Sequence, residues 1–207
     1  MNIPLARRRV LAILPVFPHF LAACAIGIGF SAFVGEFVAL VARASGTSPN
    51  LNTLRHFGQL SEFELIVAML IGVPLEEFLF RKVGFIVLRG EGLSTFSTIV
   101  VTSLAFGAVH IPGGISVFAG ATTTGLLLGW LYSSKDLGLT KAIVSHLAIN
   151  FTGYVMINRI PSALSIEAFT LPIWIYIGSA ILLIAGIALH LYLNGAVAWQ
   201  RSNGPIA

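Results

Sequence analysis

The chain has 207 residues, of which 57% are hydrophobic and 10% are charged, and its formal net charge is +4. An average soluble domain is about 25% charged, so this composition excludes an ordinary water-soluble fold and predicts an integral membrane protein. The positive residues lie at the ends of apolar runs and form no basic stripe, so no nucleic-acid partner is expected. Cys24 is the single cysteine, which excludes an internal disulfide.

The first apolar run raises the question of a signal peptide, because three arginines at positions 7–9 precede it. The Leu-Ala-Ala-Cys sequence that ends at Cys24 also resembles a lipoprotein cleavage site. The apolar run nevertheless continues past Cys24 to about residue 41, with no polar segment after the cysteine, so we expect an uncleaved first helix. Pro15 and Pro18 break helices, and residues 10–18 are therefore expected to precede this helix as a short interfacial segment.

Membrane-spanning segments come next, each of which needs about 20 mostly apolar residues. The sequence offers six, at about residues 19–43, 62–88, 95–111, 114–134, 138–158 and 173–193. Residues 44–60 have the composition of an exposed loop, and the turns near residues 90–92 and 112–114 are tight. The fourth segment contains Gly125 and Gly129, whose spacing favours close helix packing. We predict an all-α transmembrane bundle of about six spans, forming a single domain over residues 1–207.

The distribution of lysine and arginine predicts the orientation of this bundle. With the N-terminus inside, seven lie on the inner side and three on the outer side. The inner set is Arg7, Arg8, Arg9, Arg89, Lys135, Lys141 and Arg201, and the outer set is Arg43, Arg55 and Arg159. Both termini are therefore predicted to be cytoplasmic. The compact chain favours the cytoplasmic membrane of a prokaryote.

Three ionisable residues interrupt the middle of the second segment: Glu76, Glu77 and Arg81. A charge at the bilayer centre costs at least about 2.5–3.5 kcal/mol, so such residues are functional candidates by default. Glu77 and Arg81 are four residues apart and share a helix face, where they can pair. Glu76 points about 100° away and is left available for proton transfer. A purely structural ion pair is the alternative interpretation of Glu77 and Arg81.

Two later segments add further polar groups. His110 ends the third segment, with Phe106 one turn earlier on the same face. His146 and Asn150, four residues apart, present one polar face of the fifth segment. Taken alone, each could be a hydrogen-bonded structural residue. Their joint occurrence with the second segment's charges favours a functional site, although His146 lies closer to the inner end of its helix than Glu76 and His110 do. We predict that these side chains nevertheless converge.

The pattern Glu76-Glu77-x-x-x-Arg81, Phe106-x-x-x-His110 and His146-x-x-x-Asn150 resembles the CaaX protease and bacteriocin-processing (Abi) family of intramembrane glutamic endopeptidases, which is related to the Ras-converting CaaX protease. The matching core covers residues 67–154. The three motifs occur in the family's order on successive membrane helices.

This resemblance implies an endopeptidase in which Glu76 acts with His110 to activate a water molecule. It implies that His146 and Asn150 stabilise the oxyanion and that Glu77 and Arg81 position the site. The expected substrate is a membrane-associated peptide or protein, and a prenylated CaaX-type C-terminus is one candidate. No cofactor and no metal are expected.

Other interpretations remain open at this point. Two glutamates and two histidines are acceptable zinc ligands, but the chain has no His-Glu-x-x-His motif. A non-catalytic immunity factor or scaffold would also be a small membrane protein. A proton-coupled transporter could use the same buried ionisable residues, although no inverted repeat is apparent.

Overall fold

A computed structural model describes residues 16–46, 61–134, 136–159 and 171–203. The helices are α2 (Val16–Ser45), α4 (Glu62–Glu77), α5 (Gly84–Gly90), α6 (Thr95–Ala108), α7 (Ile115–Ser133), α8 (Gly138–Arg159) and α9 (Ile173–Asn203). A π-helical turn η1 (Phe78–Val83) joins α4 to α5, and a 3-10 turn η2 (Ile111–Gly113) precedes α7. The described residues contain no strand, and the predicted all-α fold is confirmed. Five of the residues used to predict the orientation lie outside these ranges: Arg7, Arg8, Arg9, Arg55 and Lys135.

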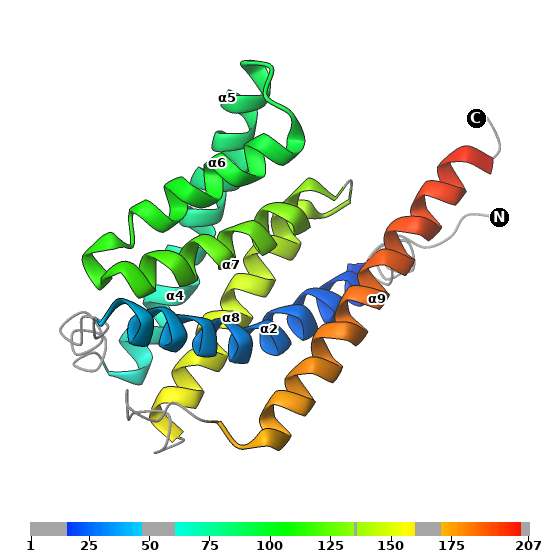
Figure 1. The fold of residues 1–207 in the computed structure, drawn as a ribbon. Coiled ribbons are helices and arrows are strands. Elements are labelled where there is room, and N and C mark those ends of the chain that lie inside the picture. Colours follow the sequence, from blue (N-terminus) through cyan, green and yellow to red (C-terminus); the bar gives the residue numbers. More distant parts are fainter. Residues whose placement is uncertain (1–15, 47–60, 135, 160–170, 204–207) are drawn as a thin grey trace.

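The helices pack as one bundle in which consecutive elements run up and down (Figure 1). α2 crosses α9 and α8, while α6 and α7 form an antiparallel hairpin. The continuous helix made by α4, η1 and α5 packs against α8 through α4 and against α6 through α5. This arrangement places the second predicted segment against both the third and the fifth, and these three segments carry the motif residues.

The helices have the surface of a membrane protein. Within the described residues, Val16–Ser45, Ile115–Ser133 and Ile173–Ala196 are long and apolar enough to cross a membrane, and Thr95–Ala108 is a shorter apolar helix. Large apolar side chains such as Phe96 and Ile173 are more than 70% exposed, whereas Glu77 and Arg81 are fully buried. Apolar groups outside and charged groups inside are what a lipid environment favours.

Glycines allow the closest helix contacts. Gly125 faces the Ser103 backbone and Gly129 faces the Ile99 side chain, each about 3.0 Å from where a Cβ would lie, which confirms the predicted packing role. An even closer crossing joins α2 to α8, where a Cβ on Gly27 would overlap the Ser145 carbonyl oxygen. The Ser145 hydroxyl, fully buried, donates a 2.7 Å hydrogen bond to Ala23 O across the same crossing.

The start of α2 differs from the sequence prediction. The helix begins at Val16 and includes Pro18. Proline is tolerated in a first helical turn, because the backbone N–H groups there have no intrahelical acceptor. Residues 16–18 therefore belong to the helix and not to a separate interfacial segment.

Lys141 belongs to the set predicted to lie on the inner side, and its environment is unusual for a lysine. Its side chain is only 2% exposed. The Lys141 ammonium donates to Ser134 Oγ at 2.9 Å and to Asn194 Oδ1 at 3.3 Å. Asn194 in turn lies 3.0 Å from His190 Nε2. Lys141 thus ties the α7–α8 connection to α9 instead of extending into solvent.

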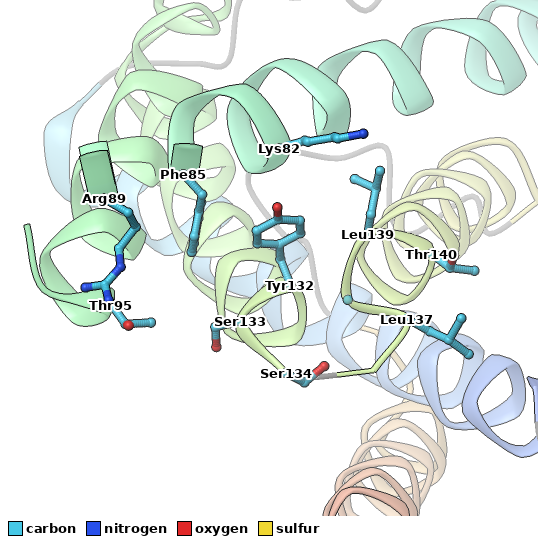
Figure 2. Close-up of a pocket in the computed structure, with 11 residues that line it drawn as sticks. Lys82, Phe85, Arg89, Thr95, Tyr132, Ser133, Ser134, Leu137, Leu139 and Thr140 are labelled. Carbon is cyan, nitrogen blue, oxygen red and sulfur yellow. The ribbon is translucent and has the colours of Figure 1, made fainter. Parts of the chain in front are cut away.

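Near this connection lies a cavity of about 550 Å³. It opens where the end of α5, the start of α6 and the turn from α7 to α8 meet (Figure 2). Among its lining residues are Lys82, Phe85, Arg89 and Tyr132. The Phe85 and Tyr132 rings pack edge to face with centroids 4.6 Å apart, which stiffens the wall between α5 and α7.

Candidate active site

The helix that carries Glu76 changes from an α-helix to a π-helical turn at the site. Glu77 ends α4, and the next six residues form the π-helical turn, in which Gly84 N–H bonds to Leu79 O, five residues earlier. Val73, Glu77, Arg81 and Phe85 are the buried side chains along this stretch. A four-residue spacing drifts around a regular α-helix, and the wider π turn offsets that drift. The turn therefore keeps Glu77 and Arg81 on the face that meets the bundle.

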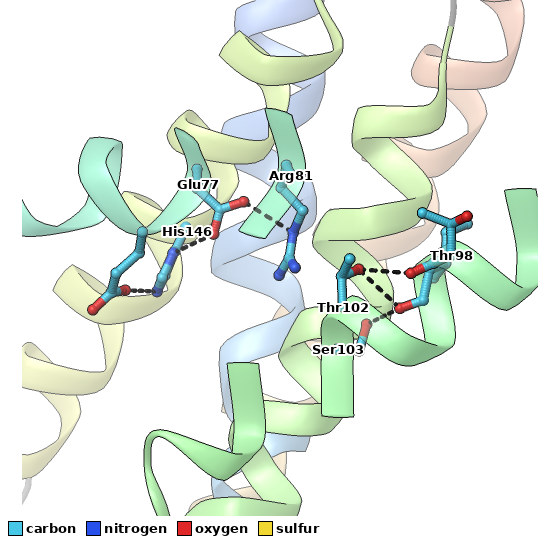
Figure 3. A network of polar contacts seen from close by, with 8 residues as sticks. Glu77, Arg81, Thr98, Thr102, Ser103 and His146 are labelled. Atoms are coloured by element: carbon cyan, nitrogen blue, oxygen red, sulfur yellow. Dashed lines mark hydrogen bonds and ion pairs between the residues drawn. The ribbon is translucent and has the colours of Figure 1, made fainter. Parts of the chain in front are cut away.

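The Glu77 carboxylate lies at the centre of the site (Figure 3). Its Oε2 is 3.1 Å from Arg81 Nε, and its Oε1 is 2.9 Å from His146 Nδ1. Both side chains of the ion pair are fully buried. The pair predicted from the four-residue spacing is present, and it extends to a histidine on α8 that is 69 positions later in the chain.

Arg81 is held by more than its carboxylate partner. Its guanidinium carbon lies 5.3 Å from the centre of the Phe106 ring, within the range of a cation–π contact. The Nε contact with Glu77 is close in distance but not aligned as a hydrogen bond, and Nη1 and Nη2 have no hydrogen-bond partner among the described residues. The buried cation therefore depends chiefly on electrostatic attraction, which makes Glu77 essential for its burial.

His146 stands between the two glutamates. An ionised Glu77 can only accept, so the proton of neutral His146 lies on Nδ1 and Nε2 is left with its lone pair. Nε2 is 3.9 Å from Glu76 Oε2. The Glu76 side chain is 39% exposed, in contrast to fully buried Glu77. Two adjacent carboxylates thus have different environments: one is enclosed and orients the histidine, and the other is accessible and faces it.

Phe106 connects the third motif helix to this group. Its ring contacts those of Phe80, His110 and His146, with centroids 5.3, 4.7 and 5.6 Å apart. The His110 Nδ1 is 2.8 Å from Phe106 O, and because a carbonyl only accepts, Nδ1 carries the proton here too. The sequence analysis included Phe106 in the Phe-x-x-x-His motif but assigned it no role. The structure shows it as the side chain around which the site is packed.

The predicted convergence is therefore found for Glu76, Glu77, Arg81 and His146, and His110 joins through Phe106. α6 ends at Ala108, and His110 precedes the 3-10 turn that contains Pro112. Gly114, at φ 100°, then reverses the chain into α7, a conformation that favours glycine. This early turn places His110 beside the rings of the site.

Asn150 is less closely tied to the group. It lies on α8 one turn beyond His146, and its side chain is partly buried. Its side chain makes no hydrogen bond to another described residue, and no hydrogen bond joins the side chains of Glu76 and His110. Within the described part of the chain, no group of three or more His, Cys, Asp or Glu side chains is arranged to hold a metal ion.

Comparison with known families identifies the pattern. Residues 59–152 match the family model described as Type II CAAX prenyl endopeptidase Rce1-like. The matched segment contains all seven motif residues, and the family resemblance predicted from them is confirmed. Comparisons with curated proteins and with solved structures gave no match. The family match and the apolar helices together support a membrane protease, with a peptide or protein as its substrate.

Proposed function

We propose that the chain is a glutamate-dependent intramembrane endopeptidase in which Glu76 is the general base. The observation that carries this proposal is the contrast between Glu76, accessible and 3.9 Å from His146 Nε2, and Glu77, which is enclosed by Arg81 and His146. A base must reach its substrate, whereas an orienting carboxylate must be fixed. The expected substrate is a membrane-associated peptide or protein, with a prenylated C-terminus as the first class to test.

The chemical steps balance with these groups alone. Glu76 takes a proton from a water molecule, whose oxygen attacks the scissile carbonyl carbon, and the carbonyl electrons move to the oxygen. Collapse of this tetrahedral intermediate breaks the C–N bond, and the proton on Glu76 passes to the leaving amine. His110, held at Nδ1 by Phe106 O, presents Nε2 as a second acceptor that can position the water.

The oxyanion needs donors that are fixed before the reaction, since preorganised donors stabilise developing charge most strongly in a water-poor site. The Asn150 amide supplies such N–H groups, and His146 on the same face of α8 adds one from Nε2 when its ring has taken a second proton from solvent before the reaction. Glu77 holds His146 at Nδ1 throughout, and Arg81 holds Glu77. In this proposal Glu77 and Arg81 are positioning residues.

The test is cleavage of a fluorogenic peptide library, including prenylated CaaX peptides, by purified protein in liposomes. Glu76→Gln preserves shape but removes the base, and loss of general-base catalysis lowers rates by about 10²- to 10⁴-fold. Glu91→Gln is the matched control, because this exposed carboxylate lies on the turn after α5 and outside the site.

Cleavage by the wild type and the control, but not by Glu76→Gln, supports the proposal. Equal cleavage by Glu76→Gln and the wild type refutes it. If the wild type cleaves no peptide in the library, a non-catalytic role such as immunity or scaffolding becomes the better interpretation.

A further inference from the structure

The cavity between α5, α6, α7 and α8 is separate from the motif residues. Phe85 on its wall lies two turns beyond Glu77 along the same helix, and Thr140 lies six residues before His146 on α8. None of Glu76, Glu77, Arg81, His110, His146 or Asn150 lines it. The proposed peptide hydrolysis uses no residue of this cavity, so the hydrolysis does not explain which residues line the cavity.

The lining of the cavity is positively charged. Lys82 and Arg89 line it, and among the described residues no aspartate or glutamate does. Figure 2 shows Lys82, from the π-helical turn, and Arg89, from the end of α5, on either side of Phe85. Arg89 is fixed by a 2.6 Å hydrogen bond from Nη1 to Leu93 O, and Lys82 Nζ lies 5.4 Å from the centre of the Phe78 ring. Glu91 and Asp136 are near in sequence but are not part of the lining. The cavity thus concentrates positive potential.

Neutral hydrogen-bond donors on the opposite wall of the cavity also favour an anionic ligand. The first turn of α8, from Gly138 to Thr140, lines the cavity, and the N–H groups of a first helical turn have no intrahelical acceptor. The N-terminus of this helix of 22 residues also carries partial positive charge. The Tyr132 and Thr95 side chains add hydroxyl groups to the lining. Two cations, hydroxyl groups and backbone amides together are the chemistry that binds a phosphate.

The location indicates the source of that phosphate. Arg89 belongs to the set predicted to lie on the cytoplasmic side, so the cavity opens at that end of the bundle. Ile86 and Phe96, on the helices that bound it, are 64% and 76% exposed, as expected for side chains that face acyl chains. Basic pockets between membrane helices on the cytoplasmic side bind anionic lipid headgroups. We propose that this cavity binds the phosphate headgroup of an anionic phospholipid.

The test is lipid binding by the purified full-length chain in detergent, measured by native mass spectrometry with phosphatidylglycerol and with phosphatidylcholine. Each cation near an anionic headgroup contributes enough for about a five-fold change in affinity. We expect Lys82→Gln and Arg89→Gln each to weaken phosphatidylglycerol binding about five-fold, and the double variant about 25-fold. Lys82→Arg keeps the charge and should restore most of the affinity.

Arg43→Gln is the matched control, since Arg43 is a partly exposed cation near the C-terminal end of α2, paired with Glu36, and does not line the cavity. It should bind phosphatidylglycerol as the wild type does. Competition by millimolar inorganic phosphate supports recognition of the phosphate itself, and competition by glycerol phosphate alone supports recognition of the larger headgroup. Equal binding of both lipids by the wild type overturns the proposal. So does unchanged phosphatidylglycerol binding in the double variant, or competition only by peptides with a free C-terminal carboxylate. Lipid binding is independent of cleavage, so this result does not depend on the proposed protease activity.

Discussion

The buried pair of Glu77 and Arg81 gives the sharpest test of the site's energetics. Both side chains are fully buried, and their closest charged atoms are 3.1 Å apart. With an effective dielectric constant of about 20, opposite charges at this distance attract by about 5 kcal/mol. Removing one partner leaves the other charge buried without compensation, which typically costs about 3–5 kcal/mol. We therefore expect Glu77→Leu and Arg81→Met each to destabilise the protein by about that amount.

The double variant should behave differently. Replacing both partners of a buried ion pair with apolar residues removes both desolvation costs, and such replacements are often neutral or stabilising by about 1–4 kcal/mol. The exchange also leaves His146 Nδ1 without its acceptor, which offsets part of this gain. The double variant should therefore be several kcal/mol more stable than the sum of the single effects indicates, while its cleavage activity stays low because His146 is no longer oriented.

The assay is reversible unfolding in mixed micelles, followed by circular dichroism for the wild type, both single variants and the double variant. The four free energies of unfolding form a double-mutant cycle, whose coupling term should be several kcal/mol. Additive effects within about 0.5 kcal/mol would show that the two charges do not depend on each other, and would refute the assignment of Glu77 and Arg81 as one buried unit.

Three further predictions concern packing and chemistry. Phe106 is 2% exposed and contacts three rings and one cation of the site. Phe106→Ala should therefore lower the free energy of unfolding by about 3–5 kcal/mol. Phe106→Leu should retain most of the stability but lose cleavage activity, with both properties measured in the same micelles. Gly27→Ala should destabilise the protein by about 1–3 kcal/mol, because the new Cβ would overlap the Ser145 carbonyl. Gly72→Ala is the control and should stabilise the protein by up to about 1 kcal/mol, because no atom lies within 4 Å of its Cβ position. Equal shifts in melting temperature for the two variants would contradict the α2–α8 crossing. Treatment with a strong zinc chelator should leave peptide cleavage unchanged, and loss of activity that added zinc restores would favour the metalloprotease interpretation instead.

Much of the fold followed from hydropathy, since long apolar runs in a membrane have few alternatives to helices. The exceptions are local. The π turn at Phe78–Val83 leaves no signal in hydropathy, because it changes the twist of a helix and not its composition. The burial of Lys141 was equally hidden, since a lysine near the end of an apolar run usually extends toward the membrane surface. Only the positions of Ser134 and Asn194 show why it turns inward.

The candidate site was predictable as a set of residues but less so as an arrangement. Spacing alone paired Glu77 with Arg81, since residues four apart share a helix face. The contact between Glu77 and His146 joins positions far apart in the chain, so it depends on how α8 packs against the second segment. The packing around Phe106 was also beyond prediction, because the Phe-x-x-x-His motif names this residue but not the side chains of other helices that contact it.

The difference between the two adjacent glutamates follows from this packing. Neighbours on a helix point in different directions, so one helix contact cannot enclose both. α8 packs on the side of the helix that carries Glu77, and His146 Nδ1 donates to Oε1 of that carboxylate. Glu76 therefore lies at the edge of the helix contact, near Nε2 of the same ring. A single histidine thereby links an enclosed carboxylate to an accessible one. Under the proposed function, an adjacent pair of glutamates supplies both at once, because the helix itself separates the group proposed to stay fixed from the group proposed to reach a substrate.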